Sequence, residues 1–371
     1  MKKNIARHWP YILTGPVLAV LLITFWYFNQ NYLGDKKNAV VLLLENPILT
    51  FGFIMLGAYI SAHIFGEFSI KIPVTYEPML YALAGGVIMG IGATIAAMSV
   101  YSIVLFNLAG IFNLTAFMVT KGWIYAVFMI AGGFFGSKLF RLLTLKTGRS
   151  QKEFYIPQEL MEGKTQKVVF YAAIGIFAAF VAMIVLFSKL DVAGKAGFAF
   201  AVFFLAVFGV VVERGTICMS SMLKEWFLSS SSYVWRSILF TVMCLALLYQ
   251  AGLKYSLFGP IEMEKYVSNA GLLMLGSFMM GFGFIFADGC FIGSLWKAGQ
   301  GNIVNIAGIL GMLFGIGVSQ FIVMAARLTG AAGGSIPNRV DSVVPAAVFL
   351  AVLWGAGLLL LLVFKPKHYR Y

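Results

Sequence analysis

The chain has 371 residues, of which 61% are hydrophobic and only 11% are Asp, Glu, Lys or Arg. Soluble domains carry about 25% charged residues, so this composition excludes an ordinary soluble fold and predicts a membrane protein. The formal charge is +13. The basic residues stand in short breaks between apolar runs, which excludes a nucleic-acid groove and is typical of the cytoplasmic loops of membrane proteins.

Ten apolar segments predict an all-α polytopic membrane protein with about ten transmembrane or half-membrane helices. Two segments, 122–137 and 196–212, are shorter than the roughly 20 residues of a full crossing, as is common where helices break inside a transporter. Met1–Arg7 is basic, and no small-residue cleavage site follows the first run, so we expect an uncleaved first span. The segments are residues 11–29, 47–66, 79–100, 122–137, 168–187, 196–212, 234–253, 270–287, 302–326 and 343–364.

The charge distribution predicts the orientation and the domain organisation. With a cytoplasmic N-terminus, most basic residues fall on the cytoplasmic side of a cell inner membrane, and the C-terminus falls there too. We expect a single transmembrane domain over residues 1–371. It divides into a first repeat half at 30–137, a basic cytoplasmic linker at 138–167, and a second half at 168–371.

An internal repeat relates two glycine-rich segments that align without gaps at an offset of 191 residues. Within this alignment Ser99 stands opposite Cys290. The two copies are an odd number of spans apart, which predicts two inverted repeats with a substrate site near the membrane midplane. The matches are Gly85, Met89, Gly90, Gly92, Ala96 and Gly110 with Gly276, Met280, Gly281, Gly283, Ala287 and Gly301.

Polar residues interrupt the apolar pattern directly after the span that ends at 287. The run contains Asp288, Gly289 and Cys290, continues to Lys297, and reaches the next span at Asn302. Free backbone N–H groups and a helix start at Asn302 could hold an anion there. An ordinary polar turn is the alternative, but polar groups inside a membrane usually mark a functional site.

A second interruption places charges and a thiol together. Glu213 and Arg214 stand four to five residues before Cys218. An isolated charge there is costly, so the two residues could pair with each other or with the substrate, since a guanidinium suits oxyanions. Both could instead be interfacial anchors. A thiol is polarisable and suits a soft sulfur atom better than a hydroxyl does. Cys244 has apolar neighbours, so we predict that it is structural.

No metal or cofactor is expected. The histidines are dispersed, and the spacing of the three cysteines fits neither a zinc site nor a disulfide framework. The absence of haem- or cluster-ligand spacing argues against a non-catalytic subunit of a redox complex. The histidines are His8, His63 and His368.

Taken together, these segments resemble the YeeE/YedE family of membrane proteins over roughly residues 50–330. The cysteine segments and the closing Gly-x-Gly-Asn are the most specific parts. The resemblance is carried by Gly66-Glu67-Phe68, Pro73, Gly85-Gly86, Met89 to Ala93, Arg214 to Cys218, Gly281-x-Gly283, Asp288-Gly289-Cys290 and Gly299 to Asn302.

The resemblance implies an inverted-repeat fold and, for characterised members, import of thiosulfate, with cysteine thiols that contact the substrate sulfur. Cys218 and Cys290 match two of those cysteines, and Ser99 stands where a third is usual. That departure keeps a selenium compound or another sulfur species open as the substrate. The resemblance also allows a small cytoplasmic sulfur-carrier protein as a partner.

We therefore predict a permease, not an enzyme. A membrane sulfurtransferase that forms a persulfide on Cys290 is the alternative. It would need a cationic neighbour to stabilise the thiolate, and Lys297 is the nearby candidate.

Overall fold

The computed structural model describes residues 9–31, 47–96, 122–147, 153–157, 192–225, 233–257 and 270–328, together with the isolated positions 171, 175, 178 and 227. Helices make up most of this part of the chain, as the apolar composition requires. The elements are α1 (Tyr11–Asn31), α3 (Pro47–Ile64), β1 (Ser69–Pro73), α4 (Glu77–Ile95), α7 (Gly122–Thr147), β2 (Glu153–Pro157), α9 (Val192–Arg214), α10 (Met219–Lys224), α11 (Tyr233–Lys254), α12 (Ala270–Phe286), α13 (Phe291–Gly299) and α14 (Ile303–Leu328).

The length and apolarity of these helices confirm a polytopic, helical membrane protein. Within the described ranges, five helical stretches are long and apolar enough to cross a membrane. They are Glu77–Ile95, Ala126–Leu143, Gly197–Lys224, Val234–Lys254 and Gly271–Gly299. The predicted spans 168–187 and 343–364 lie outside the described residues, apart from isolated positions, so the count of ten remains a prediction.

The two segments predicted to be short are full-length helices. α7 has 26 residues and α9 has 23. α7 also runs on to Thr147, well into the segment from 138 that was assigned to the linker. Long basic side chains let a helix continue past the apolar layer, so the end of apolarity does not mark the end of the helix.

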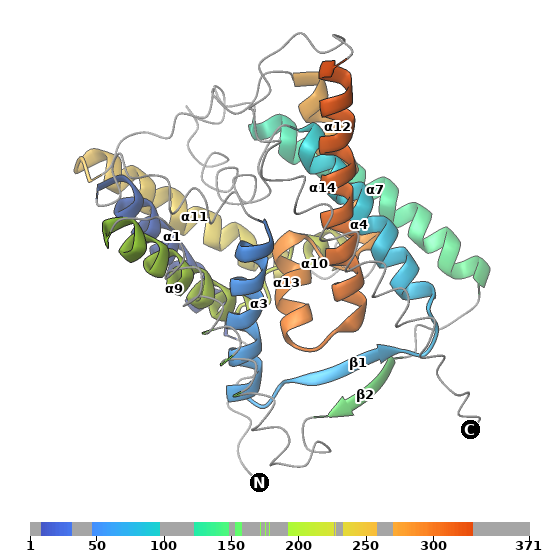
Figure 1. The fold of residues 1–371 in the computed structure, drawn as a ribbon, viewed down its shortest axis with the longest axis horizontal. Helices are drawn as coiled ribbons and strands as arrows, with labels where there is room; N and C mark the ends of the chain where they lie inside the picture. Colours follow the sequence, from blue (N-terminus) through green and yellow to red (C-terminus); the bar gives the residue numbers. More distant parts are fainter. Residues whose placement is uncertain are drawn as a thin grey trace.

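The helices form two groups with short elements between them (Figure 1). α1, α9 and α11 pack together in one group. α4, α7, α12 and α14 pack together in the other. α3 packs on α9 and on α13, while α10 contacts both groups. The short helices α10 and α13 therefore lie at the junction of the two groups.

Glycines let α4 and α12 meet backbone to backbone. A Cβ on Gly85 would lie 2.7 Å from the Gly283 carbonyl oxygen, and a Cβ on Gly92 would lie 2.7 Å from the Gly276 oxygen. The contacts are reciprocal, and their order makes the two helices antiparallel. This orientation agrees with inverted copies. The remainder of the repeat, including Ser99, lies outside the described residues, so two inverted repeats remain a prediction.

A small antiparallel sheet ties together distant segments below these helices (Figure 1). Strand β1 pairs with β2 in a register that sets Lys71 opposite Tyr155. Lys71 also forms a parallel bridge with Asn302, and the Ser69 amide donates to the Gln300 carbonyl at 3.1 Å. The turn between α13 and α14 is therefore held by β1.

Candidate functional site

Two helices break near the junction, and both breaks have the same construction. α9 gives way to α10 through Thr216, whose φ is 50°, and α12 gives way to α13 through Asp288, whose φ is 55°. A left-handed residue ends a helix because it turns the chain away from the axis. In both breaks the cysteine two residues later has extended backbone and caps the next helix: Cys218 caps α10 and Cys290 caps α13.

The two thiols satisfy backbone donors at these helix starts. Cys218 Sγ accepts from the Ser221 amide at 3.5 Å. Cys290 Sγ accepts from Gly293 N at 3.2 Å and, across the junction, from Met219 N at 3.3 Å. Cys290 thus contacts the first residue of the helix that Cys218 caps.

Gly293 lies between the two sulfur atoms. A Cβ at this position would overlap Cys218 Sγ and would lie 3.3 Å from Cys290 Sγ. Both cysteines are free thiols, and their side chains are buried, with exposed fractions of 0% and 3%. Because Gly293 has no side chain, both thiols can pack against it and lie close to each other.

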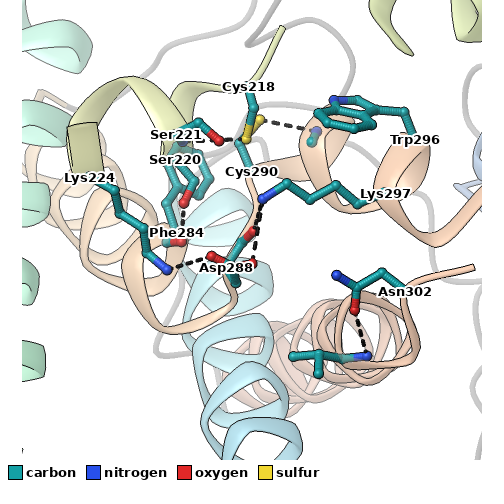
Figure 2. A network of polar contacts seen from close by, with 12 residues as sticks. Cys218, Ser220, Ser221, Lys224, Phe284, Asp288, Cys290, Trp296, Lys297 and Asn302 are labelled. Carbon is teal, nitrogen blue, oxygen red and sulfur yellow. Dashed lines mark hydrogen bonds and ion pairs between the residues drawn. The ribbon is translucent and has the colours of Figure 1, made fainter. Parts of the chain in front are cut away.

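A carboxylate between two lysines lies beside this point (Figure 2). Lys224 Nζ contacts Asp288 Oδ1 at 2.6 Å. Lys297 Nζ donates to the Asp288 backbone carbonyl at 2.6 Å and lies 3.5 Å from Oδ2. Lys224 ends α10 and Lys297 is in the last turn of α13, so each short helix carries one thiol and one lysine. We call Cys218, Lys224, Asp288, Cys290 and Lys297 the thiol–lysine cluster.

Arg214 belongs to a different group of contacts. Its guanidinium contacts Glu213 through two hydrogen bonds of 2.6 Å and Glu67 through a third of 2.6 Å. Ser61 and Gln300 donate to the Glu213 carboxylate at 2.6 and 2.7 Å. Phe65 stacks on the guanidinium, with its ring centroid 4.2 Å away. We call Ser61, Glu67, Glu213, Arg214 and Gln300 the arginine cluster.

Buried polar atoms near Gly289 lack partners among the described residues. They are the Ser294 hydroxyl and both polar atoms of the Asn305 side chain. A Cβ on Gly289 would overlap Ser294 Oγ and would lie 2.9 Å from Asn305 Oδ1. Unsatisfied buried polar groups are costly, so these atoms are available to a water molecule or a ligand.

The predicted site residues fall into three sets. Cys218, Asp288, Gly289, Cys290 and Lys297 come together. Arg214 is paired with Glu67 and Glu213 in the arginine cluster. Asn302 caps α14, where its side-chain oxygen accepts from the Val304 amide at 3.1 Å. The polar run between the two predicted spans is mostly helix α13, which Cys290 caps, and not a polar turn. Ser99 lies outside the described residues.

Three residues near the site, Lys224, Ser294 and Asn305, were not predicted from the sequence. Lys224 had a signal, since it follows Cys218 by six residues much as Lys297 follows Cys290 by seven. Ser294 and Asn305 stand in ordinary helical sequence, and only their burial without partners draws attention to them. Cys244 lies on α11, half-buried against the hydrophobic core, and its structural role remains a prediction.

Comparison with known proteins gives a consistent result. A family described as sulphur transport matches residues 1–135 and 214–370. The probable transporter YedE is 21% identical in Salmonella typhimurium and 22% identical in Escherichia coli, each over 279 residues that cover 69% of this chain and 61% of YedE. The thiosulfate transporter TsuA of Spirochaeta thermophila is 27% identical over 111 residues, 30% of this chain and 32% of TsuA. The matched region spans about three fifths of the length of the YedE proteins.

Proposed function

Because this chain belongs to the sulphur transport family, as the YeeE/YedE resemblance predicted, we propose that it is a permease that imports a small sulfur-containing anion, with thiosulfate as its substrate. Its relatives are named as transporters, one of them for thiosulfate. The choice of thiosulfate and the part played by the cysteines are our proposal.

The observation that carries the proposal is the pairing of thiols with lysines on two short helices. α10 carries Cys218 and Lys224, and α13 carries Cys290 and Lys297. A polarisable thiol suits a soft sulfur atom, whereas an ammonium suits the negative charge of an anion. An anion with a sulfur end and an oxygen end would use both kinds of contact at once.

The buried polar atoms beside Gly289 support the same substrate class. The Ser294 hydroxyl and the Asn305 amide have hydrogens to donate and no partner among the described residues. We propose that they donate to the substrate's oxygen atoms. Their position on α13 and α14, beside the link that carries Asp288, would place these donors near the lysines.

We further propose that the chain lies in the cell inner membrane with both termini in the cytoplasm. Substrate would then leave on the side where β1 and β2 lie, since the predicted cytoplasmic loops contain both strands. A small cytoplasmic sulfur-carrier protein is the acceptor that we propose. The thiols would guide the anion without forming a covalent bond to it.

Radiolabelled thiosulfate uptake in a strain that lacks its own sulfur transporters tests the function. We expect the wild-type chain and Cys244→Ala to take up label, and unlabelled thiosulfate to compete better than sulfate or selenite. An empty vector sets the background, and the amount of protein in the membrane is measured for each sample. Uptake at background level, or competition by selenite alone, would contradict thiosulfate transport.

One observation favours a second candidate, a membrane sulfurtransferase. Cys290 Sγ accepts two backbone N–H groups, and such donors stabilise a thiolate. The thiolate could then attack the outer sulfur of thiosulfate, breaking its S–S bond, so that sulfite leaves and Cys290 keeps the outer sulfur as a persulfide. Purified protein incubated with thiosulfate and probed for persulfide decides between the two. Persulfide on Cys290 with no uptake would favour the enzyme.

A further inference from the structure

Resting on the proposed function, we propose that Asp288 is a tethered competitor of the substrate: its carboxylate occupies the anion site between Lys224 and Lys297, and a doubly charged anion displaces it.

The charge of the cluster is the first argument. Two ammonium groups face one carboxylate, so among the described residues the ion pairs leave this lysine pair with one positive charge in excess. A dianion in place of Asp288 would balance both lysines, whereas a monoanion would do no better than the carboxylate already there. The site therefore fits an anion of charge −2, such as thiosulfate, better than one of charge −1.

The unequal contacts of Asp288 are the second argument. Its carboxylate has one close partner, Lys224 Nζ at 2.6 Å, while Lys297 Nζ is 3.5 Å away. The Asp288 side chain is also 44% exposed, against 20% for Lys224 and 17% for Lys297. An exposed carboxylate with one close partner is easier to displace than a buried one with several.

Both lysines have other contacts that would hold them after the carboxylate leaves. Lys297 keeps its 2.6 Å hydrogen bond to the Asp288 backbone carbonyl, which does not depend on the side chain. Lys224 Nζ lies 5.1 Å from the centroid of the Phe140 ring, a cation–π contact. The anion site would therefore keep its shape while its occupant changes.

The link between α12 and α13 suits a side chain that exchanges places with a ligand. Asp288 stands in this link and not inside a helix, with φ of 55°. Aspartate, asparagine and glycine tolerate this left-handed backbone better than other residues do. Asp288→Asn and Asp288→Gly therefore remove the charge without forcing the backbone to change.

The decisive experiment measures anion affinity in the full-length chain after the carboxylate is removed. Thiosulfate is titrated by thermal shift on purified protein, and concentration dependence of uptake is measured in cells, for wild type, Asp288→Asn and Asp288→Gly. A competitor that fills the site nine-tenths of the time weakens apparent affinity about tenfold, so we expect both variants to bind roughly tenfold more tightly. Lys224→Met should bind at least about tenfold more weakly, since it loses half of the cationic site.

The controls separate this inference from a structural ion pair and from the proposed function. Asp288→Glu keeps the charge and should not bind thiosulfate more tightly than wild type does. In Asp288→Asn, the affinity for thiocyanate, a monoanion, should rise less than the affinity for thiosulfate. If both neutral variants bind thiosulfate no more tightly than wild type does, the competitor role is overturned. Absent wild-type uptake would overturn the proposed function alone, because the binding titration still decides the role of Asp288.

Discussion

The thiol–lysine cluster and the arginine cluster have opposite charge balances and opposite exposures. The first sets two lysines against one carboxylate, and its Asp288 side chain is 44% exposed. The second sets two carboxylates against one guanidinium, and Glu213 and Arg214 are 0% and 1% exposed. Buried charges that contact each other on all sides hold helices in place, whereas two partly buried lysines that share one exposed carboxylate are suited to bind an anion.

The contrast also lies in how the two clusters connect the fold. The arginine cluster joins the ends of α3 and α9 to the turn before α14 through Glu67, Glu213 and Gln300. The thiol–lysine cluster lies where two short helices begin and end. One helix, α13, is capped at its start by Cys290 of the first cluster and ends at Gly299, next to Gln300 of the second. The arginine cluster therefore fixes the far end of the helix that Cys290 caps.

Breaking the arginine cluster should have the largest effect. Arg214→Met leaves two carboxylates without their guanidinium, and breaking a buried ion pair costs about 3–5 kcal/mol. We expect little folded protein in the membrane and a large fall in the thermal stability of what remains. Lys224→Met is the matched control and should cost about 1 kcal/mol or less, because its pair is partly exposed. Equal losses in the two variants would remove the distinction between the clusters.

The second largest effect tests the thiol directly. We expect Cys290→Ala to abolish uptake, a fall of well over about tenfold, while the amount of protein in the membrane stays normal, because losing a helix cap costs only about 1 kcal/mol. Labelled thiosulfate uptake and an immunoblot of the membrane fraction measure both quantities. Cys290→Ser keeps an acceptor for the cap. Full uptake by either variant would remove the Cys290 thiol from the mechanism.

Gly293→Ala should sharpen the comparison, because it disturbs the site and leaves the arginine cluster intact. The new methyl group would overlap Cys218 Sγ, and overpacking of this kind costs about 1–3 kcal/mol. We expect uptake to fall severalfold in folded protein. Gly308→Ala is the control, since its Cβ would have ordinary contacts of 3.4 Å and longer. Similar uptake in the two variants would contradict the placement of both thiols at Gly293.

A smaller effect is expected at Ser99, the residue that the internal repeat sets opposite Cys290. A hydroxyl is a harder and stronger donor than a thiol. We expect Ser99→Cys to fold and to change how strongly sulfate and selenite compete with thiosulfate. Competition curves for the variant and the wild type measure this. Identical curves, together with normal uptake by Ser99→Ala, would mean that Ser99 does not contact the substrate.

Cys244→Ala should have the smallest effect of all. Cys244 packs half-buried against the hydrophobic core on α11, and alanine replaces a small apolar group there at little cost. We expect uptake within about twofold of wild type, equivalent to less than about 0.5 kcal/mol. A loss as large as that of Cys290→Ala would show that thiols in general, and not their place in the cluster, determine uptake.

Much of the fold could be predicted because a bilayer demands long apolar helices, and these are visible as apolar runs. The ends of the helices were harder to predict. α7 continues past residue 138 into the predicted linker, and α13 forms between two predicted spans. In both cases polarity was taken as the end of a helix. In α13 the decisive residue is Cys290, which is seldom considered as a helix cap.

The members of the site were predicted better than their arrangement. Cysteines and charges inside apolar sequence are conspicuous, which is why Cys218, Asp288, Cys290 and Lys297 were found. The pairing of Lys224 with Asp288 joins residues 64 positions apart and depends on how α10 packs beside the break in α12. The pairing of Arg214 with the adjacent Glu213 could be anticipated from the sequence, but its contact with Glu67, 147 positions away, could not. Such contacts are set by packing across the junction.

The capping of α13 by Cys290 determines which way its hydrogen can point. Two amide hydrogens approach the sulfur, from Gly293 and Met219, and they occupy the electron pairs on that side. The S–H hydrogen must then leave the sulfur in another direction, away from both amides. Cys218 is the side-chain hydrogen-bond partner of Cys290, so this hydrogen is directed within the thiol pair. An anion that meets Cys290 would therefore compete with Cys218 for this hydrogen.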